Sequence, residues 1–251
     1  MSKEVEKIGN TAVEEFRGQS GQGTEGLGTD DVRPPRLVLA QSNHPQVKKG
    51  NAKYIQGLSE GDLFNDLTGA ILPLPLEVVI VQFLGRRAIE FYPMDGPGPH
   101  GVKDFNVPFY GKNDPRTDPR AKFGPNGEKP AATVFYEYLV YLPQTGEIAS
   151  LSLKGTQLKV ATTLNSLLKY PITINGEMIT SPPAWARTYL LGSASQQKDQ
   201  YQWSNYTLSQ RGVTDPAVRK IAADLFESFK AKTVVIPVED EGDAADEPTP
   251  F

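Results

Sequence analysis

Aromatic residues that alternate with polar ones on predicted strands are the part of this sequence best suited to binding a flat ligand. Tyr201 and Trp203 share one face of a predicted strand at 200–209, because alternate residues of an extended chain point the same way. A ring offers a face on which any nucleic-acid base can stack, although rings also fill the cores of small β domains. The candidate stacking residues are Phe91, Tyr110, Phe123, Tyr136, Tyr138, Trp185, Tyr189, Tyr201 and Trp203.

Basic side chains occur next to several of these rings, many of them in a long segment at 93–131 that is rich in Pro and Gly. Within it an Asp-Pro-Arg unit occurs twice, ending at Arg116 and Arg120. Lysine and arginine neutralise phosphates and release counterions, so this pattern favours binding of a nucleic acid. The alternative is a solvated loop in which Asp and Arg neutralise each other. The candidate phosphate-binding residues are Arg86, Arg87, Lys112, Arg116, Arg120, Lys122, Lys154 and Arg187.

The formal net charge of −4 hides an uneven distribution of charge along the chain. Acids outnumber bases in residues 1–31 and 239–251, whereas residues 32–238 hold 23 basic and 17 acidic residues, a net charge of about +6. A basic body between acidic ends commonly accompanies polyanion binding. The six acids of residues 239–251 predict an extended tail, tethered where it competes with polyphosphate for the basic body.

The end of this tail combines a hydrophobic anchor with negative charge, which is a compact element for a partner's pocket. A generic solubilising tail is the alternative, but it gives no reason for an aromatic last residue. The candidate partner-binding residues are Asp246, Glu247, Pro250 and Phe251.

Several function classes are excluded by composition and by missing motifs. The chain has no cysteine and two histidines, so a disulfide, a thiolate metal site and a cysteine nucleophile are excluded, and we expect no metal and no cofactor. Phosphate-loop, dinucleotide-binding and serine-hydrolase motifs are absent, so we expect no enzyme. We also expect no membrane segment and no signal peptide, and therefore a cytoplasmic protein, in the bacterial host cytoplasm if phage-encoded.

The predicted strands follow from runs of β-branched and aromatic residues between turn signals. Gly85, inside the longest run, predicts a bulge or a bend. We predict strands at 37–40 and 77–91, a hairpin at 133–142 and 147–154, and a second hairpin at 185–191 and 200–209.

Two helices complete the predicted fold. One covers 156–169, and Thr214-Asp215-Pro216 opens the other with a cap residue and a proline in the first turn. The apolar stripe of the second helix is Val218, Ile221, Ala222, Leu225 and Phe229.

We therefore predict a mainly β protein with two helices, of the α+β class. From residue 77 the order is strand, hairpin, helix, hairpin, which is the order of a five-stranded OB barrel. The predicted organisation is a flexible N-terminal segment at 1–31, an OB-like domain at 32–237, and a disordered acidic tail at 238–251. The domain has extra N-terminal strands, the loop insertion at 93–131 and a C-terminal helix.

The tail also carries a resemblance to a known family. The acid run that ends in Pro-Phe resembles the C-terminal tip of bacterial single-stranded DNA-binding proteins, and phage-encoded members carry similar tails. The body does not look like the bacterial protein, so the resemblance suggests a divergent phage-type member. It implies that the tail recruits replication and repair enzymes.

These observations predict non-sequence-specific binding of single-stranded DNA in replication or recombination, with the oligomeric state left open. One alternative is a recombination mediator that anneals strands, which ring formation on DNA would reveal. Another is a virion or host-interaction protein, with the rings in the core and the tail as a docking peptide. Failure to bind an oligonucleotide at low salt would favour that last class.

Deletion of residues 239–251 should raise the affinity for single-stranded DNA, most strongly at low ionic strength, because the tail competes with the strand for basic side chains. Phe251→Ala, a control that keeps the acids, should leave this affinity unchanged and weaken binding of a partner enzyme. Titration of a fluorescent oligo-dT measures the first effect. A truncated protein that binds DNA no better than the full chain would contradict the competition.

Overall fold

The fold is described here from a computed structural model, which covers residues 22–24, 33–91, 102–104 and 115–230. Contacts divide the chain into two units, residues 1–33 and residues 34–251. Every helix and strand named below belongs to the second unit. The described part has no helix that is long and apolar enough to cross a membrane.

The longest strand, β4 (Leu76–Phe91), lies in the middle of the sheet and pairs with three others. Its β-branched run Val78–Val81 is fully buried. A continuous apolar run of this kind is typical of a strand that is covered on both faces. The register against β6 (Ala132–Leu142) shifts between Phe83 and Gly85, and Gly85 has a φ of 129°, a value that L side chains rarely adopt. The bulge predicted at Gly85 is confirmed.

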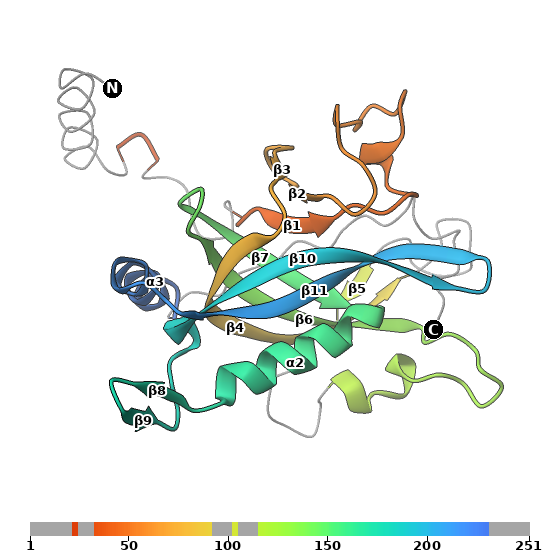
Figure 1. Cartoon of the computed structure of the whole chain (residues 1–251). Coiled ribbons are helices and arrows are strands. Elements are labelled where there is room, and N and C mark those ends of the chain that lie inside the picture. The colour runs from red at the N-terminus through yellow and green to blue at the C-terminus, as the bar shows by residue number, and fades with distance from the viewer. Residues whose placement is uncertain (1–21, 25–32, 92–101, 105–114, 231–251) are drawn as a thin grey trace, which may run out of the picture. The chain divides into compact units, whose positions relative to one another are not determined.

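One curled sheet contains most of the strands, in the order β11-β10-β4-β6-β7-β1-β2-β3, with β5 added to the end of β4 (Figure 1). β6 and β7 (Glu147–Lys154) form the predicted hairpin, and β1 pairs in parallel with β7. A separate hairpin of β8 and β9 follows the first helix. The remaining strands are β1 (Arg36–Leu39), β2 (Leu63–Asn65), β3 (Ile71–Leu72), β5 (Val102–Asp104), β8 (Ile172–Ile174), β9 (Glu177–Ile179), β10 (Arg187–Lys198) and β11 (Tyr201–Val213).

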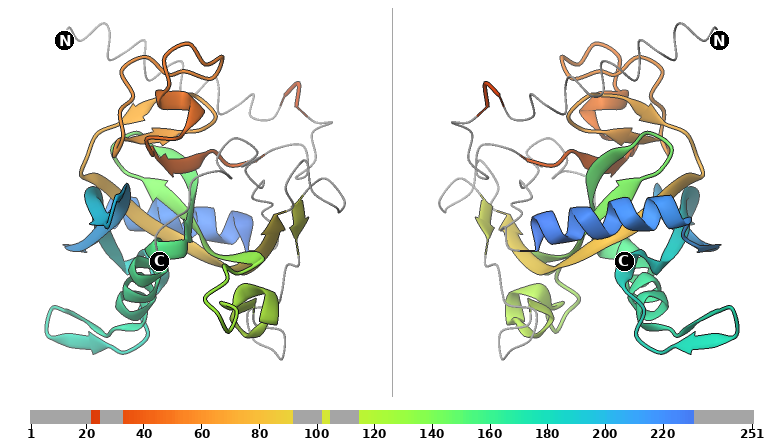
Figure 2. Two further views of the ribbon diagram at one scale, coloured as in Figure 1. Left: turned by 90° about the vertical axis from the view of Figure 1, so that its right-hand side faces the viewer. Right: turned by 90° about the vertical axis from the view of Figure 1, so that its left-hand side faces the viewer.

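Two α-helices of the described part cover opposite faces of the sheet, as the turned views show (Figure 2). α2 (Leu158–Lys169) buries Ala161 and Leu164 on the inner face, against alternate residues of β6 and β7. α3 (Pro216–Phe229) packs Ala222 on the outer face of β4 and β6. As predicted, Asp215 caps α3, and its carboxylate accepts a hydrogen bond from the main chain of Ala217 at 2.9 Å.

The sheet curls back on itself, so that β1 lies near the end strand β11. The Tyr206 hydroxyl of β11 donates to the carbonyl oxygen of Leu37 in β1 at 3.2 Å. One residue past β1, Ala40 is fully buried, and the side chain of Gln41 contacts the main chain of Ser204. Side-chain contacts therefore join β1 and β11, which are not paired as strands.

The mainly β fold with two helices is confirmed, as are both helices and the hairpin of β6 and β7. Three details differ from the predictions. Trp185 lies in a 3-10 helical turn (Ala184–Ala186) that precedes β10, so it is not a strand residue. Ile221 is 41% exposed, and Phe226 packs on the outer face in its place. The hairpin of β8 and β9 lies between the predicted helix at 156–169 and the predicted hairpin from 185, where we predicted no strand.

Candidate nucleic-acid interface

A basic loop between β1 and β2 is the clearest site for a polyanion in the described structure. Residues 41–57, which we call the lysine loop, carry Lys48, Lys49 and Lys53, all exposed, and no acid occurs between residues 41 and 59. Because no carboxylate of the loop itself neutralises these ammonium groups, they present a local charge of three to solvent. The sequence signal for this site, an acid-free run with three lysines, was present but not used in our prediction.

The lysine loop has a small core of its own, which holds its shape. Val47 and Ile55 pack on a cluster of buried residues that includes Leu58 and Phe64. The main-chain nitrogen of Ile55 donates to the carbonyl of Gln46 at 2.9 Å, so the two sides of the loop are joined. A loop that is packed by its own side chains is typical of ordered functional loops.

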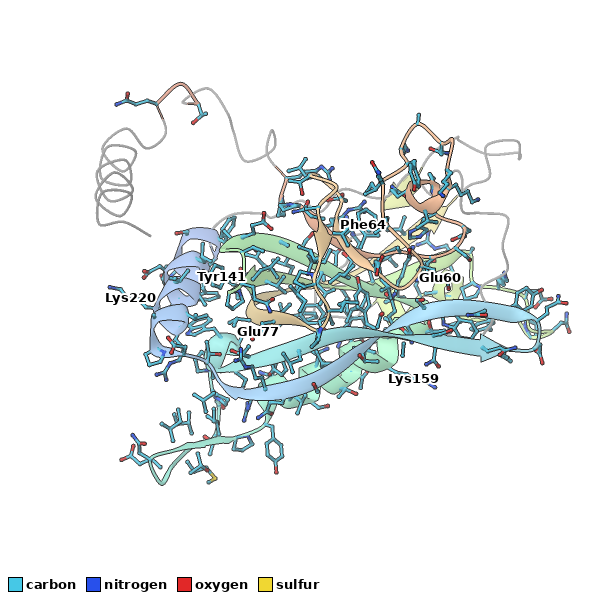
Figure 3. All side chains as sticks on the ribbon, turned by 45° about the horizontal axis from the view of Figure 1, so that its top comes forward. Glu60, Phe64, Glu77, Tyr141, Lys159 and Lys220 are labelled. Atoms are coloured by element: carbon cyan, nitrogen blue, oxygen red, sulfur yellow. The ribbon has the colours of Figure 1, made fainter. Side chains whose placement is uncertain are left out.

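The lysine loop is fixed to the distal part of the β10–β11 hairpin, more than a hundred residues away in sequence. The Gln41 amide nitrogen donates to the Ser204 carbonyl at 2.9 Å, and the Ser204 nitrogen donates to Gln41 Oε1 at 2.9 Å. The Ser193 hydroxyl donates to the carbonyl of Gly61 at 2.6 Å. Figure 3 shows Glu60 beside this hairpin, in agreement with its contact with the Ser204 hydroxyl. These contacts attach the two ends of the segment that contains the lysine loop to a hairpin that carries two half-buried rings.

Two of the predicted stacking residues lie on this hairpin. Trp203 is paired with Gln196 and Tyr201 with Lys198, so the two rings, an amide and an ammonium group share one face. Both rings are half-buried, and the indole Nε1 is shielded from solvent without a hydrogen-bond partner. Because the Trp203 neighbours are polar and its ring is only partly covered, the ring can still offer area to a base.

The candidates Trp185 and Arg187, which we predicted on the strand that pairs with that of Trp203, do not form a continuous surface with Trp203. Arg187 pairs with Val213, ten residues along β11 from Trp203, a separation of about 33 Å along the strand. Trp185 packs on Phe226 of α3 with ring centroids 5.0 Å apart. Arg187 is buried and donates to the carbonyls of Leu167 and Pro171, at 3.0 and 2.7 Å, so it holds the end of α2.

Three of the predicted stacking tyrosines lie in the inner core. Tyr136, Tyr138 and Tyr189 are at most 6% exposed, which leaves no ring face for a base in this conformation. The Tyr138 hydroxyl donates to Asn165 of α2 at 3.0 Å, and burial raises the pKa of both Tyr138 and Tyr189. Arg86 lies over the Tyr136 ring, with its guanidinium carbon 4.8 Å from the centroid, so it too is engaged inside the protein.

Arg87 and Lys154 lie on the outer face, where β4, β6 and β7 are adjacent. The Arg87 guanidinium donates to Glu137 at 2.7 Å, and both side chains are at most 10% exposed. The ammonium group of Lys154 is 5.6 Å from the centroid of the Phe135 ring. The Arg87 charge is therefore compensated by a buried carboxylate, while Lys154 is partly open to solvent.

The Asp-Pro-Arg segment is only partly basic at its surface. The Arg120 guanidinium donates two hydrogen bonds to the Asp118 carboxylate, at 3.0 and 2.9 Å, which lower the pKa of Asp118 to about 2. Because Asp118 stays ionised at neutral pH, it neutralises Arg120. Arg116 and Lys122 are exposed, and the Phe123 ring beside them is 50% exposed.

Several candidates fall outside the described residues, and the structure brings only part of the others together. Trp203 and Tyr201 lie on the strand to which the lysine loop is attached, whereas the core tyrosines, Arg87 and Arg187 serve the fold. The described residues hold no group of three metal-ligating side chains. The candidates outside the described part are Tyr110, Lys112, the side chain of Phe91, Asp246, Glu247, Pro250 and Phe251.

A comparison with family models matches residues 6–235 to the Pam3 phage gp34-like protein family. The chain belongs to this family. Membership indicates a bacteriophage protein and covers both the lysine loop and the hairpin of β10 and β11. No curated protein and no solved structure matches this gp34-like protein.

The role of Arg87 in this gp34-like protein can be tested by stability measurements. Arg87→Met should lower the free energy of unfolding by about 3–5 kcal/mol, because Glu137 would remain buried without its partner. Arg87→Met combined with Glu137→Leu removes both charges and should recover most of that loss. Urea unfolding measures both effects.

The exposed Arg116 offers a matched control, and Arg116→Met should change the stability by at most about 0.5 kcal/mol. An Arg87→Met protein as stable as the wild type would show that the pair does not support the fold.

Proposed function

We propose that this gp34-like protein binds single-stranded DNA without sequence specificity, through the lysine loop and the outer rings of the β10–β11 hairpin. The observation that carries the proposal is the double hydrogen bond between Gln41 and Ser204, which ties the first residue of the lysine loop to the strand that carries Trp203. Ammonium groups that bind phosphates and partly exposed rings that stack on bases are the two elements of single-strand binding that does not depend on base sequence. Phage membership is consistent with a role in DNA replication or recombination.

The strand order supports a modified OB-like barrel as the scaffold of this function. β4 pairs with β6 and β10, and the order β4, β6, β7, α2, β10, β11 is that of an OB fold. Oligonucleotides bind OB folds near the loops that follow the first and fourth strands. In this chain the corresponding connections are residues 92–131, which include β5 and the basic Asp-Pro-Arg segment, and the two-residue turn at 199–200. β1 would be an added strand between β7 and β11.

The acidic tail completes the proposal. Its six carboxylates would keep the free protein from binding weak polyanions, and its terminal Pro-Phe would recruit replication or repair enzymes in the host cytoplasm. The support for this role is the sequence of the tail and its resemblance to bacterial single-stranded DNA-binding proteins.

Charge reversal in the lysine loop tests the electrostatic half of the interface. Lys48→Glu, Lys49→Glu and Lys53→Glu together should flatten the plot of log affinity against log salt by about 2, because each phosphate contact contributes about 0.7 on a single strand. The control reverses Lys169, Lys220 and Lys230, which lie on or directly after α2 and α3. Figure 3 shows Lys220 at the other end of the view from Glu60.

Both triple variants change the net charge equally, so a difference between them reports position rather than total charge. Equal slopes in the two variants would remove the lysine loop from the interface. A wild-type protein that does not bind oligo-dT at low salt would contradict the whole proposal and favour a virion or host-interaction role.

The two tryptophans of the chain make the stacking half testable by fluorescence. In a Trp185→Phe protein the remaining Trp203 should be quenched by oligo-dT, whereas in a Trp203→Phe protein Trp185 should respond little, since it packs on α3. Trp203→Ala should weaken binding by about 1–3 kcal/mol and leave the melting temperature nearly unchanged. A Trp203→Ala protein that unfolds easily and binds normally would assign this residue to the core.

A further inference from the structure

The side chain of Gln41 occupies the place of a neighbouring strand at the edge of β11. Its amide both donates to and accepts from the main chain of Ser204, at 2.9 Å in each case. This is the pair of bonds that a residue of an adjacent antiparallel strand would exchange. One side chain therefore links the second residue after β1 to the residue after Trp203.

Gln41 is also the first residue of the lysine loop. Its main-chain nitrogen donates to His44 Nδ1 at 3.4 Å, and His44 in turn accepts the nitrogen of Val47 through its carbonyl. The same residue thus begins the turn that leads to Lys48 and Lys49 and binds the strand that carries Trp203.

The small core of the lysine loop does not depend on the Gln41 side chain. Val47, Ile55, Leu58 and Phe64 hold the loop together through apolar contacts. Loss of the Gln41 amide would therefore leave a folded loop and a folded hairpin, which the contacts of Gly61 with Ser193 and of Glu60 with Ser204 still join, and would loosen the beginning of the loop.

We propose that Gln41 is the positioning residue of the interface, which sets the lysine loop and the Trp203 ring in one geometry before a single strand arrives. This inference rests on the proposed function. Single-stranded DNA that contacts both parts then binds two surfaces whose relative position is already fixed. The conformational entropy of ordering them has been lost in folding, so it does not reduce the affinity. Without the two hydrogen bonds between Gln41 and Ser204, the lysines and the ring would still bind DNA, but their spacing would no longer be fixed.

Gln41→Met tests this role, because methionine has a similar length and cannot form either hydrogen bond with Ser204. We expect about tenfold weaker binding of an oligo-dT of about 20 nucleotides, together with a shallower salt dependence. The change should be small for a strand of about four nucleotides, near the lower limit of single-strand site sizes, because it cannot contact both parts. Gln197→Met, an exposed substitution on the same hairpin, is the matched control.

A measurement without DNA separates the two proposals. Since the chain has no cysteine, Lys53→Cys and Lys198→Cys allow two spin labels to be attached at defined sites, one on the lysine loop and one on the hairpin. The distance distribution between the labels should be narrow with Gln41 and broad with Gln41→Met.

The outcomes are distinct. A broad distribution together with weaker binding of the long strand supports the positioning role, and a purely structural role would weaken the short and long strands equally. Unchanged affinity and salt dependence in a Gln41→Met protein that binds DNA would overturn the positioning role alone. Absence of binding by the wild-type protein would overturn the proposed function, and the positioning role with it.

Discussion

The outer edge of β11 needs a partner, because a long strand edge offers its main-chain groups to any other chain. β11 is the last strand of the sheet and pairs only with β10 among the described strands. Gln41 satisfies both main-chain groups of Ser204, and the Asn205 side chain accepts the nitrogen of Tyr206 at 2.9 Å. Two side chains thus occupy the part of the edge that lies nearest to β1. The position of the lysine loop depends on this protection, since the loop begins at Gln41.

Coverage of both sheet faces explains why so many rings and cations of the chain serve the fold. α2 covers the inner face and α3 part of the outer face, so the alternate residues of β4 and β6 are buried in both directions. Tyr138 and Tyr189 then lie inside, and Arg87 requires Glu137 as a partner. The distal part of the β10–β11 hairpin extends beyond α2 (Figure 1), and its side chains are accordingly more exposed.

Local patterns in the sequence predicted the elements better than the site. The Asp215 cap, the bulge at Gly85 and the β6–β7 hairpin each depend on neighbouring residues, so a single sequence reveals them. Which ring of a strand is buried depends on what covers it. No sequence pattern that we used showed that α3 would pack on Trp185. The register of β10 against β11 also had to be known before Arg187 could be separated from Trp203. The Gln41 contact with Ser204 joins residues 163 apart, which no local pattern can show.

The distance over which charge acts explains how a protein of net charge −4 can present a local surface of positive charge. At an ionic strength of 0.1 M the field of an exposed charge is largely screened beyond about 10 Å, so an approaching phosphate responds to nearby groups and not to the net charge. The lysine loop has three ammonium groups and no acid of its own, and the Arg120 charge is neutralised by Asp118 next to it. Local attraction therefore depends on the loop keeping its place on the surface. That place is fixed by a neutral amide, whose hydrogen bonds are not screened by salt, so the position of the site is less sensitive to ionic strength than its affinity.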